Sequence, residues 1–293
     1  RLRRERPDAL IVGTFKKAWL AALAARLAGV PRVLLRVGLE TDTPRSAKYR
    51  FVLTRWVDAI AVNAARMRAP FLALPGWTKA RVATIHNGVH LPPRRLRPGS
   101  VRAALGIPAE ARVVGAVARL ASQKRFDRLL RAVARMPPGV HCILAGDGEL
   151  RGELERLVAE LRIADRVHFL GHRTDTADVL DALDLFAVTS DREGMSNAML
   201  EALAAGVPVA STPVSGADEA LDPLPDGRRP GVIMPFDDDA ILETLSGLLA
   251  DPAGLAEMGG AAVERAAARF SMAAMIDAWE VLLARSAGAR RGE

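Results

Sequence analysis

Short apolar segments alternate with amphipathic segments along almost the whole chain, and this alternation limits the fold more than any other feature. The apolar segments are nearly continuous in hydrophobic residues, as expected for strands buried on both faces of a sheet. Strands separated by helices predict parallel sheets covered by helices on both faces. The predicted strands are Ala9–Gly13, Arg32–Val37, Asp58–Val62, Arg81–Ile85, Arg112–Ala118, Val140–Ala145, Val167–Phe169, Leu185–Thr189, Val207–Ser211 and Gly231–Met234. The predicted helices between them are Lys16–Ala28, Asp127–Arg135, Leu150–Leu161, Thr176–Asp184 and Asn197–Ala205, with consecutive helices from Asp238 to about Ala287.

A Pro- and Arg-rich stretch, Leu91–Gly99, divides this pattern and is typical of an interdomain linker. Four predicted strands precede it and six follow it. We therefore predict two Rossmann-like, doubly wound α/β domains, the first of them incomplete by roughly 70 residues at its N-terminus. The predicted boundaries give a partial domain at residues 1–92 and a second domain at residues 93–272. A helix within residues 273–293 is predicted to pack back on the first domain.

Composition excludes several classes of protein. The single cysteine, Cys142, lies in an apolar segment, which rules out a disulfide scaffold and predicts a buried thiol. No apolar run approaches the roughly 20 residues needed to span a bilayer, and no signal peptide is visible. A soluble globular protein with a sizeable core is expected from 293 residues of which 50% are hydrophobic.

Positive charge is concentrated in the first part of the chain. Up to Pro93 there are 17 Lys and Arg against five Asp and Glu, whereas the remainder has 24 against 29. This imbalance favours an anionic partner, either a membrane surface or an acidic acceptor, and a solvated basic surface is the alternative. Nucleic acid is not expected, because the basic segments lack interleaved aromatic residues, metal-finger spacing and a helix-turn-helix pattern.

Two glutamates, Glu193 and Glu201, lie eight positions apart in the sequence EGMSNAMLE. The first is predicted on a turn after a strand and the second inside the helix that follows. A helix N-terminus suits a phosphate, and two carboxylates along it would accept hydrogen bonds from the hydroxyls of a phosphate-bearing sugar. Since glutamates are common on helix surfaces, the pair also fits a solvated helix face.

Two cations, Arg119 and Lys124, stand at either end of a short loop after the first strand of the second domain. Ligands bind at such strand ends in open α/β sheets, and two cations at this spacing would clamp a diphosphate. A surface loop with two solvated cations is the alternative.

Two glycine-containing turns follow the next two strands. Gly146 and Gly148 permit a tight turn and close approach of a ligand, although a plain strand–helix turn needs the same residues. Gly171, followed by His172 and Arg173, would offer main-chain hydrogen bonds to the edge of a base. A histidine in such a place is also common as a surface or packing residue.

Taken together and in this order, these motifs resemble the donor-binding half of a family 4 glycosyltransferase, here truncated at the N-terminus. Members of that family have the GT-B fold, in which two Rossmann-like domains flank a cleft. The resemblance covers nearly the whole chain and includes His86-Asn87-Gly88-Val89 before the linker. The family's N-terminal Gly-rich turn and its histidine near the donor sugar have no counterpart. In the region that matches the latter, Arg36 and Glu40 would either contact the acceptor or form a structural ion pair.

The resemblance also implies roles for single residues. Arg119 and Lys124 would hold the donor diphosphate and stabilise its charge as the nucleoside diphosphate leaves. Glu193 would contact the transferred sugar, and Glu201 would accept hydrogen bonds from the ribose. The remaining substrate-binding positions are Gly146, Gly148, Gly171, Arg173, Gly194, Met195 and Ser196. Neither a metal nor a cofactor is expected, because the two cations neutralise the diphosphate and the nucleotide sugar is itself a substrate.

We therefore expect a retaining glycosyltransferase that moves a sugar from a nucleoside-diphosphate sugar to a saccharide or lipid-linked acceptor, in surface polysaccharide or glycolipid synthesis. Its expected location is the cytoplasm, partly as a peripheral protein on an anionic inner membrane face. A non-catalytic nucleotide-sugar-binding subunit and a GT-B phosphorylase or epimerase are the alternatives. An NAD-dependent oxidoreductase is disfavoured, because the sequence has no G-x-G-x-x-G followed by an acidic residue.

Overall fold

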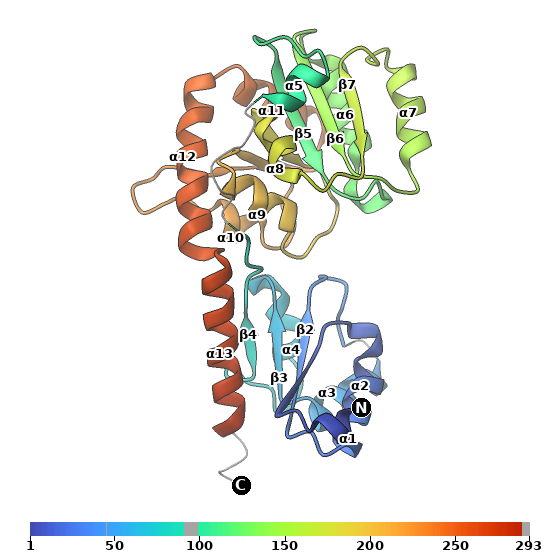
Figure 1. Cartoon of the computed structure of the whole chain (residues 1–293), viewed down its shortest axis with the longest axis vertical. Helices are drawn as coiled ribbons and strands as arrows, with labels where there is room; N and C mark the ends of the chain where they lie inside the picture. Colours follow the sequence, from blue (N-terminus) through green and yellow to red (C-terminus); the bar gives the residue numbers. More distant parts are fainter. Residues whose placement is uncertain (45, 91–98, 289–293) are drawn as a thin grey trace. The chain divides into compact units, whose positions relative to one another are not determined.

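The computed structural model describes residues 1–44, 46–90 and 99–288, which form two compact units (Figure 1). The first unit contains Arg1–Gly88, Glu193–Met195 and the residues from Met272 onward, and the second contains Val89–Arg192 and Ser196–Ser271. Each unit is built around its own parallel sheet, which confirms the predicted α/β class. Residues 91–98 of the predicted linker, and the predicted boundary between residues 92 and 93, lie outside the described residues.

The described part of the first unit has a four-stranded parallel sheet of order β1-β2-β3-β4. The strands are β1 (Ala9–Val12), β2 (Arg32–Val37), β3 (Ala59–Val62) and β4 (Val82–Thr84). The elements that cover one face are η1 (Phe15–Lys17), α2 (Ala18–Leu27), α3 (Ala47–Trp56), η2 (Ala65–Arg68) and α4 (Ala69–Leu72). The C-terminal helix α13 (Met272–Gly288) packs on the other face, and a short helix α1 (Leu2–Glu5) precedes the sheet. Coverage of both faces explains why every position of β3 is apolar.

The described part of the second unit has a six-stranded parallel sheet of order β10-β9-β8-β5-β6-β7. The strands are β5 (Arg112–Val117), β6 (Val140–Ala145), β7 (Val167–Gly171), β8 (Leu185–Val188), β9 (Val209–Ser211) and β10 (Gly231–Ile233). Strand order reverses between β5 and β8, which makes this the topological switch point where open α/β sheets bind ligands.

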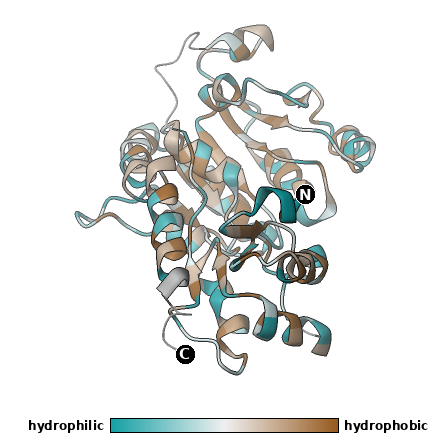
Figure 2. Cartoon of the chain, turned by 60° about the horizontal axis from the view of Figure 1, so that its bottom comes forward, coloured by the Kyte–Doolittle hydropathy of each residue, from teal (hydrophilic) through white to brown (hydrophobic). Residues whose placement is uncertain are grey.

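Helices connect the parallel strands of this second sheet and pack against it. The helices that share one apolar cluster with it are α6 (Phe126–Arg135), α7 (Arg151–Glu160), α11 (Asp238–Leu249) and the start of α12 (Pro252–Arg269). The other helical elements are α5 (Ser100–Ala104), η3 (Ser122–Lys124), α8 (Thr176–Asp181), α9 (Asn197–Ala204) and α10 (Ala217–Leu221). Brown and teal alternate along the helices in Figure 2, as expected for helices with one buried face.

An aspartate just before an inner strand ties neighbouring strands together in both units. In the first unit, Asp58 accepts hydrogen bonds at 2.7 Å from Arg26 and from a backbone N–H of β2. In the second, Asp184 accepts them at 2.9 Å from Arg102 and at 2.7 Å from a backbone N–H of β5. All four charged side chains are only 16–20% exposed. The contact within each Arg–Asp pair therefore compensates for the hydration that both charges lose on burial.

All ten predicted strands are present among the described residues, and none of their ends moves by more than two residues. The helix α3 was not predicted. Only Val52 and Leu53 of that helix are buried, so the apolar period that would identify it is nearly absent.

The buried-thiol prediction is confirmed. Cys142 is fully buried, and burial raises the pKa of its thiol to about 12. A neutral thiol of this kind packs as a small apolar side chain. Among the described residues, no helix combines the length and the hydrophobicity that crossing a membrane would require.

Candidate functional site

The loops after β5, β6 and β7 meet at one edge of the sheet in the second unit. Beyond the strand ends, the Gly146 N–H donates to the Gly171 carbonyl at 2.7 Å, and the Leu120 N–H donates to the Asp147 carbonyl at 2.9 Å. Because these bonds join backbone to backbone, they hold the three loops together as one surface whatever their side chains do.

Gly146 and Gly148 are required by the neighbouring loop. A Cβ at Gly146 would lie 1.9 Å from the carbonyl oxygen of Ala118, and a Cβ at Gly148 would lie 2.5 Å from that of Leu120. Gly146 also has a φ of +139°, which other residues rarely adopt. The sequence interpretation left two roles open for these glycines, close approach of a ligand and a plain strand–helix turn. The loop after β5 occupies the space beside both of them.

A pocket of about 530 Å³ opens at this edge of the sheet. The predicted site residues Arg119, Gly146 and Arg173 line it together, each from a different strand end. The other lining residues are Val117, Ala118, Ala145, Asp147, His172 and Thr176. A volume of this size lies within the range of small-molecule sites. The structure therefore brings three of the predicted residues into one concave surface.

The two arginines of the pocket differ in how strongly they bind their carboxylate partners. Arg119 is 70% exposed and lies 4.0 Å from the Oε1 of Glu149, a weak contact for an exposed pair. Arg173 holds Asp175 through Nε–Oδ1, at 2.8 Å, and through a second hydrogen bond. The hydrogen bond between them raises the pKa of Arg173 and lowers the pKa of Asp175. Arg119 is therefore the pocket arginine that can exchange its partner for a ligand at little cost.

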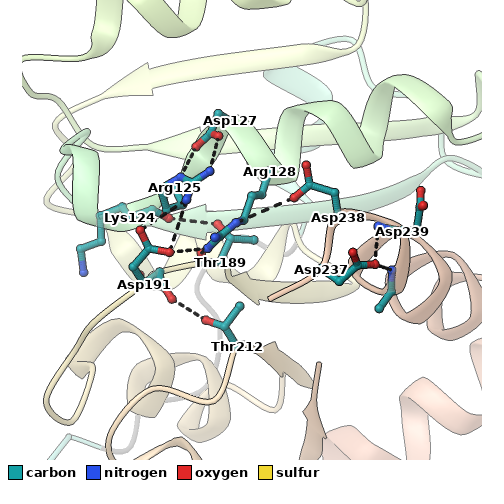
Figure 3. Close-up of polar contacts among 12 residues, drawn as sticks. Lys124, Arg125, Asp127, Arg128, Thr189, Asp191, Thr212, Asp237, Asp238 and Asp239 are labelled. Atoms are coloured by element: carbon teal, nitrogen blue, oxygen red, sulfur yellow. Dashed lines mark hydrogen bonds and ion pairs between the residues drawn. The ribbon is translucent and has the colours of Figure 1, made fainter. Parts of the chain in front are cut away.

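Lys124 ends η3 and does not line this pocket. Its carbonyl oxygen accepts a hydrogen bond at 3.0 Å from the Oγ1 of Thr189, in the loop after β8. Figure 3 shows the Lys124 side chain extending away from a group of ion pairs around Arg125 and Asp191. Lys124 is thus placed at the switch point of the sheet by its main chain.

The segment Glu193–Met195 belongs to the first unit. A Cβ at Gly194 would lie 2.1 Å from the carbonyl oxygen of Gly38, and the glutamate of the segment is only 8% exposed. The last carbonyl of the segment accepts a hydrogen bond at 3.1 Å from Asn87, whose Oδ1 in turn accepts one at 2.7 Å from Arg36. The sequence predicted that Arg36 either contacts the acceptor or forms an ion pair. The structure shows another contact, in which Arg36 orients the side chain of Asn87.

Helix α9 follows this segment in the second unit. Ser196 is its N-cap and accepts a hydrogen bond at 3.5 Å from the Met199 N–H. Glu201 lies in the second turn and is half-buried, and within the described ranges its carboxylate has no hydrogen-bond or ion-pair partner. Burial raises the pKa of Glu201. Such a carboxylate is unfavourable in isolation and would gain from donors such as ribose hydroxyls.

Two residues with clear contacts, one in each unit, were not predicted as site residues. Asn87 stands in a motif that the sequence identified, but without a role, since its partner carbonyl at Met195 is 108 residues away. Asp191 pairs with Arg128, 63 residues earlier, and no sequence spacing indicates such a pair. Within residues 1–44, 46–90 and 99–288, no group of three or more His, Cys, Asp or Glu could hold a metal ion.

Comparison with known proteins identifies the family. The sequence profile described as "Glycosyl transferases group 1" matches residues 111–251. The chain is 32% identical over 284 residues to the lipopolysaccharide core biosynthesis glycosyltransferase LpsE of Rhizobium meliloti, which covers 96% of this chain and 77% of LpsE. The chain belongs to the group 1 glycosyltransferases. This group 1 glycosyltransferase is also 34% identical over 262 residues to the D-inositol 3-phosphate glycosyltransferase of Mycobacterium marinum, covering 86% of the chain but only 54% of that relative.

Solved structures confirm the predicted GT-B fold. Anabaena HepE in complex with UDP matches this group 1 glycosyltransferase with a TM-score of 0.85, at 23% identity, over 95% of this chain and 79% of HepE. Sucrose-phosphate synthase from Thermosynechococcus elongatus matches with a TM-score of 0.77, at 22% identity, over 99% of this chain and 74% of that protein. At these identities the likeness establishes the fold alone.

Proposed function

We propose that this chain transfers a sugar, with retention of anomeric configuration, from a nucleoside-diphosphate sugar to a saccharide or lipid-linked acceptor. The pocket at the ends of β5, β6 and β7, where Arg119, Gly146 and Arg173 converge, carries the proposal. Nucleotides bind at this edge of open α/β sheets, and the pocket is large enough for a base and part of a ribose. Family membership supports sugar transfer as the reaction.

The cations have the task of neutralising the leaving group. Arg119 and Lys124 meet the donor diphosphate and stabilise the charge that grows on it as the bond to the sugar breaks. The weak contact of Arg119 with Glu149, at 4.0 Å, supports this role, because the guanidinium can leave that partner to take a bidentate anion. Glu193 contacts the transferred sugar, and Glu201 accepts hydrogen bonds from the ribose. The acceptor attacks from the face that the leaving group vacates, so no protein nucleophile is required.

UDP-glucose is the first donor to test, since HepE has been crystallised with UDP-glucose. The name of LpsE supports an acceptor in cell-surface glycan synthesis. A thermal-shift panel of UDP-, GDP- and ADP-sugars tests the donor class, because a ligand that binds only the folded state raises the melting temperature. We expect one of these sugars to raise Tm and Glu201→Ala to abolish the shift. The matched control Arg135→Ala changes an exposed arginine with one aspartate partner outside the pocket, and should leave the shift unchanged.

Release of UDP from UDP-glucose separates catalysis from binding. Turnover that falls at least tenfold in Arg119→Ala and Lys124→Ala is expected for residues that stabilise a leaving diphosphate. Binding without release from any donor would favour the non-catalytic subunit instead. A thermal shift with NAD, and with none of the nucleotide sugars, would refute the assignment.

We further propose that the outer surface of α2 and α3 contacts an anionic membrane that carries the acceptor. The elements η1, α2 and α3 contain no acidic residue. Lys16, Lys17, Lys48 and Arg55 are exposed on them, and the apolar side chains that project from the same helices are Leu20 (54% exposed), Leu27 (67%) and Phe51 (55%). Basic and apolar groups on one surface favour anionic lipid, to which each basic residue adds about 1 kcal/mol near the membrane.

Vesicle sedimentation tests this surface. We expect binding to phosphatidylglycerol-containing vesicles at low salt, release as ionic strength rises, and little binding to pure phosphatidylcholine. The double variant Leu20→Ser/Phe51→Ser should reduce binding severalfold, whereas Val263→Ser, at a 43% exposed position of α12, should not. Equal binding to both vesicle types would exclude an electrostatic contact.

A further inference from the structure

Two loops stand on either side of the topological switch point in the second unit. Residues 122–125 follow β5, and residues 189–191 follow its parallel neighbour β8. The Asp191 N–H donates to the Gln123 carbonyl at 2.9 Å, and the Thr189 Oγ1 donates to the Lys124 carbonyl at 3.0 Å. The main chain of Lys124 therefore depends on a loop that begins more than 60 residues later in the sequence.

The Asp191 carboxylate lies between two arginines (Figure 3). Its Oδ1 is 2.6 Å from the Nη1 of Arg128, and both of its oxygens are 3.4 Å from the Nη1 of Arg125. Arg128 is only 11% exposed and also donates to the Thr189 carbonyl at 3.2 Å. A guanidinium this buried needs acceptors, so Arg128 fixes both ends of the 189–191 loop to α6.

Arg125 joins the other loop to the same carboxylate. It adopts a left-handed backbone with φ +50°, which costs a residue with a side chain roughly 1 kcal/mol. Two hydrogen bonds of 2.9 Å to Asp127, together with the contact to Asp191, hold the arginine in that conformation. Burial acts to raise the pKa of Asp127, but the hydrogen bond and charge of Arg125, with the charge of Arg128, lower it overall. Arg125 and Asp127 therefore both stay charged across the physiological pH range.

We call Arg125, Asp127, Arg128 and Asp191 the brace. Its two guanidinium groups face its two carboxylates, and Arg128 has a further contact at 3.8 Å with Asp238. Since both arginines are already neutralised, the brace contributes little net charge to an incoming phosphate. The Lys124 side chain extends away from the brace (Figure 3).

We propose that Asp191 is a positioning residue that acts through the brace to hold Lys124 in the orientation that neutralises the donor diphosphate. The proposal rests on the function proposed for Lys124. Removing the carboxylate leaves Arg128 without its shortest contact and removes the 3.4 Å contacts to Arg125. The 122–125 loop is then held at the switch point only by the bonds from the Asp191 N–H and the Thr189 Oγ1, and we expect it to be more mobile. An ammonium group on a mobile loop stabilises the transition state less. The entropy lost in orienting it then adds to the activation free energy of the reaction.

A double-mutant cycle tests the proposal on kcat/KM for UDP release from UDP-glucose. Asp191→Asn should lower kcat/KM about tenfold in the wild-type background and less than about twofold in Lys124→Ala, since the two residues act as one unit. Thr189→Val removes only the hydrogen bond to the Lys124 carbonyl and should show the same background dependence. Asp226→Asn breaks an Arg–Asp pair of 2.7 Å on an exposed loop and should change neither background. Losses that multiply in the double variant would overturn the proposal, because Asp191 would then act independently of Lys124.

Hydrogen exchange of residues 121–126, measured without nucleotide, tests the brace independently of catalysis. Exchange should be faster in Asp191→Asn and Thr189→Val than in the wild type, and unchanged in Asp226→Asn. Unaltered exchange in the first two variants would refute the brace even if the sugar-transfer function holds. Conversely, faster exchange in a protein that binds no nucleotide sugar would uphold the brace and remove the function assigned to Lys124.

Discussion

At the scale of single residues, the environment of Glu201 favours a bound hydrogen-bond donor. It is half-buried on α9, and within the described residues nothing donates a hydrogen bond to its carboxylate. The sequence predicted its place on the helix from the eight-residue spacing. The absence of a partner could not be predicted, because it depends on which side chains of distant segments fail to reach it.

Replacing Glu201 by glutamine should raise the stability of the fold and weaken nucleotide-sugar binding. Burial raises its folded-state pKa above the ordinary value of 4.5, so the folded protein holds the proton more tightly than the unfolded chain. Its contribution to stability is therefore complete below pH 4.5 and is lost as pH rises through the folded pKa. At pH 7, Glu201→Gln removes this penalty and should raise Tm by roughly 1–3 °C. The same change should weaken nucleotide-sugar binding about tenfold, measured by calorimetry.

Glu257→Gln provides the comparison, since Glu257 is exposed on α12. It should change neither Tm nor nucleotide binding. A fall in Tm for Glu201→Gln would mean that the carboxylate has a stabilising contact after all.

A methyl group at Gly146 should break the contact between the loops after β5 and β6. The added Cβ would lie 1.9 Å from a backbone oxygen at a φ of +139°, so the loop after β5 must move. We expect Gly146→Ala to cost roughly 3 kcal/mol in urea unfolding. Gly152→Ala on α7, where a Cβ meets nothing within 4 Å, should instead stabilise by roughly 0.5–1 kcal/mol. Similar effects of the two substitutions would contradict the packing described here.

At the scale of helices and strands, the hydrophobic pattern predicted the strands of both sheets but missed the helix α3. The strands are recognisable because coverage on both faces makes most positions apolar, as in β8, where all four residues are buried. In α3 only two residues are buried, so its pattern gives little indication of a helix. The loops that form the pocket and the brace are held by bonds between strand ends, and no local pattern encodes such bonds.

The aspartates that precede inner strands provide a test at this scale. Asp184→Asn keeps the shape of the side chain but leaves Arg102, which is 20% exposed, without its carboxylate. We expect a loss of about 2 kcal/mol in the free energy of unfolding. Asp58→Asn should have a similar effect through Arg26, whereas Asp226→Asn, whose carboxylate is exposed, should cost much less. A loss for Asp184→Asn no larger than that of Asp226→Asn would show that the strand-end pairs add nothing.

At the scale of the whole molecule, each unit has its own apolar core but neither is a continuous stretch of chain. The first unit takes α13 from the far end of the sequence, and Leu282 of that helix packs with Leu34, Ala61 and Ile85. The sequence predicted a return of the last helix to the first domain. It gave no indication that a three-residue segment, Glu193–Met195, also belongs to the first unit.

Core substitutions should therefore report on one unit at a time. Leu282→Ala removes a 3% exposed side chain from the first unit and should cost about 2–4 kcal/mol there. Hydrogen exchange should accelerate in β2 and β3 and stay unchanged in β5 and β6. Leu245→Ala, in the fully buried core of the second unit, should show the reverse pattern. Uniform acceleration by either variant would mean that the two cores unfold as one.

The place of α13 in the sequence also affects how the protein is made. A ribosome delivers β1 to β4 before the second unit, but the helix that shields one side of their sheet leaves the exit tunnel only after it. Until then, the nascent sheet exposes Leu34, Ala59, Ala61 and Ile85 to solvent, where chaperones or neighbouring chains can bind them. All strands and helices of the second unit have been synthesised once the ribosome passes Ser271. The second unit can therefore fold while the first unit still lacks α13.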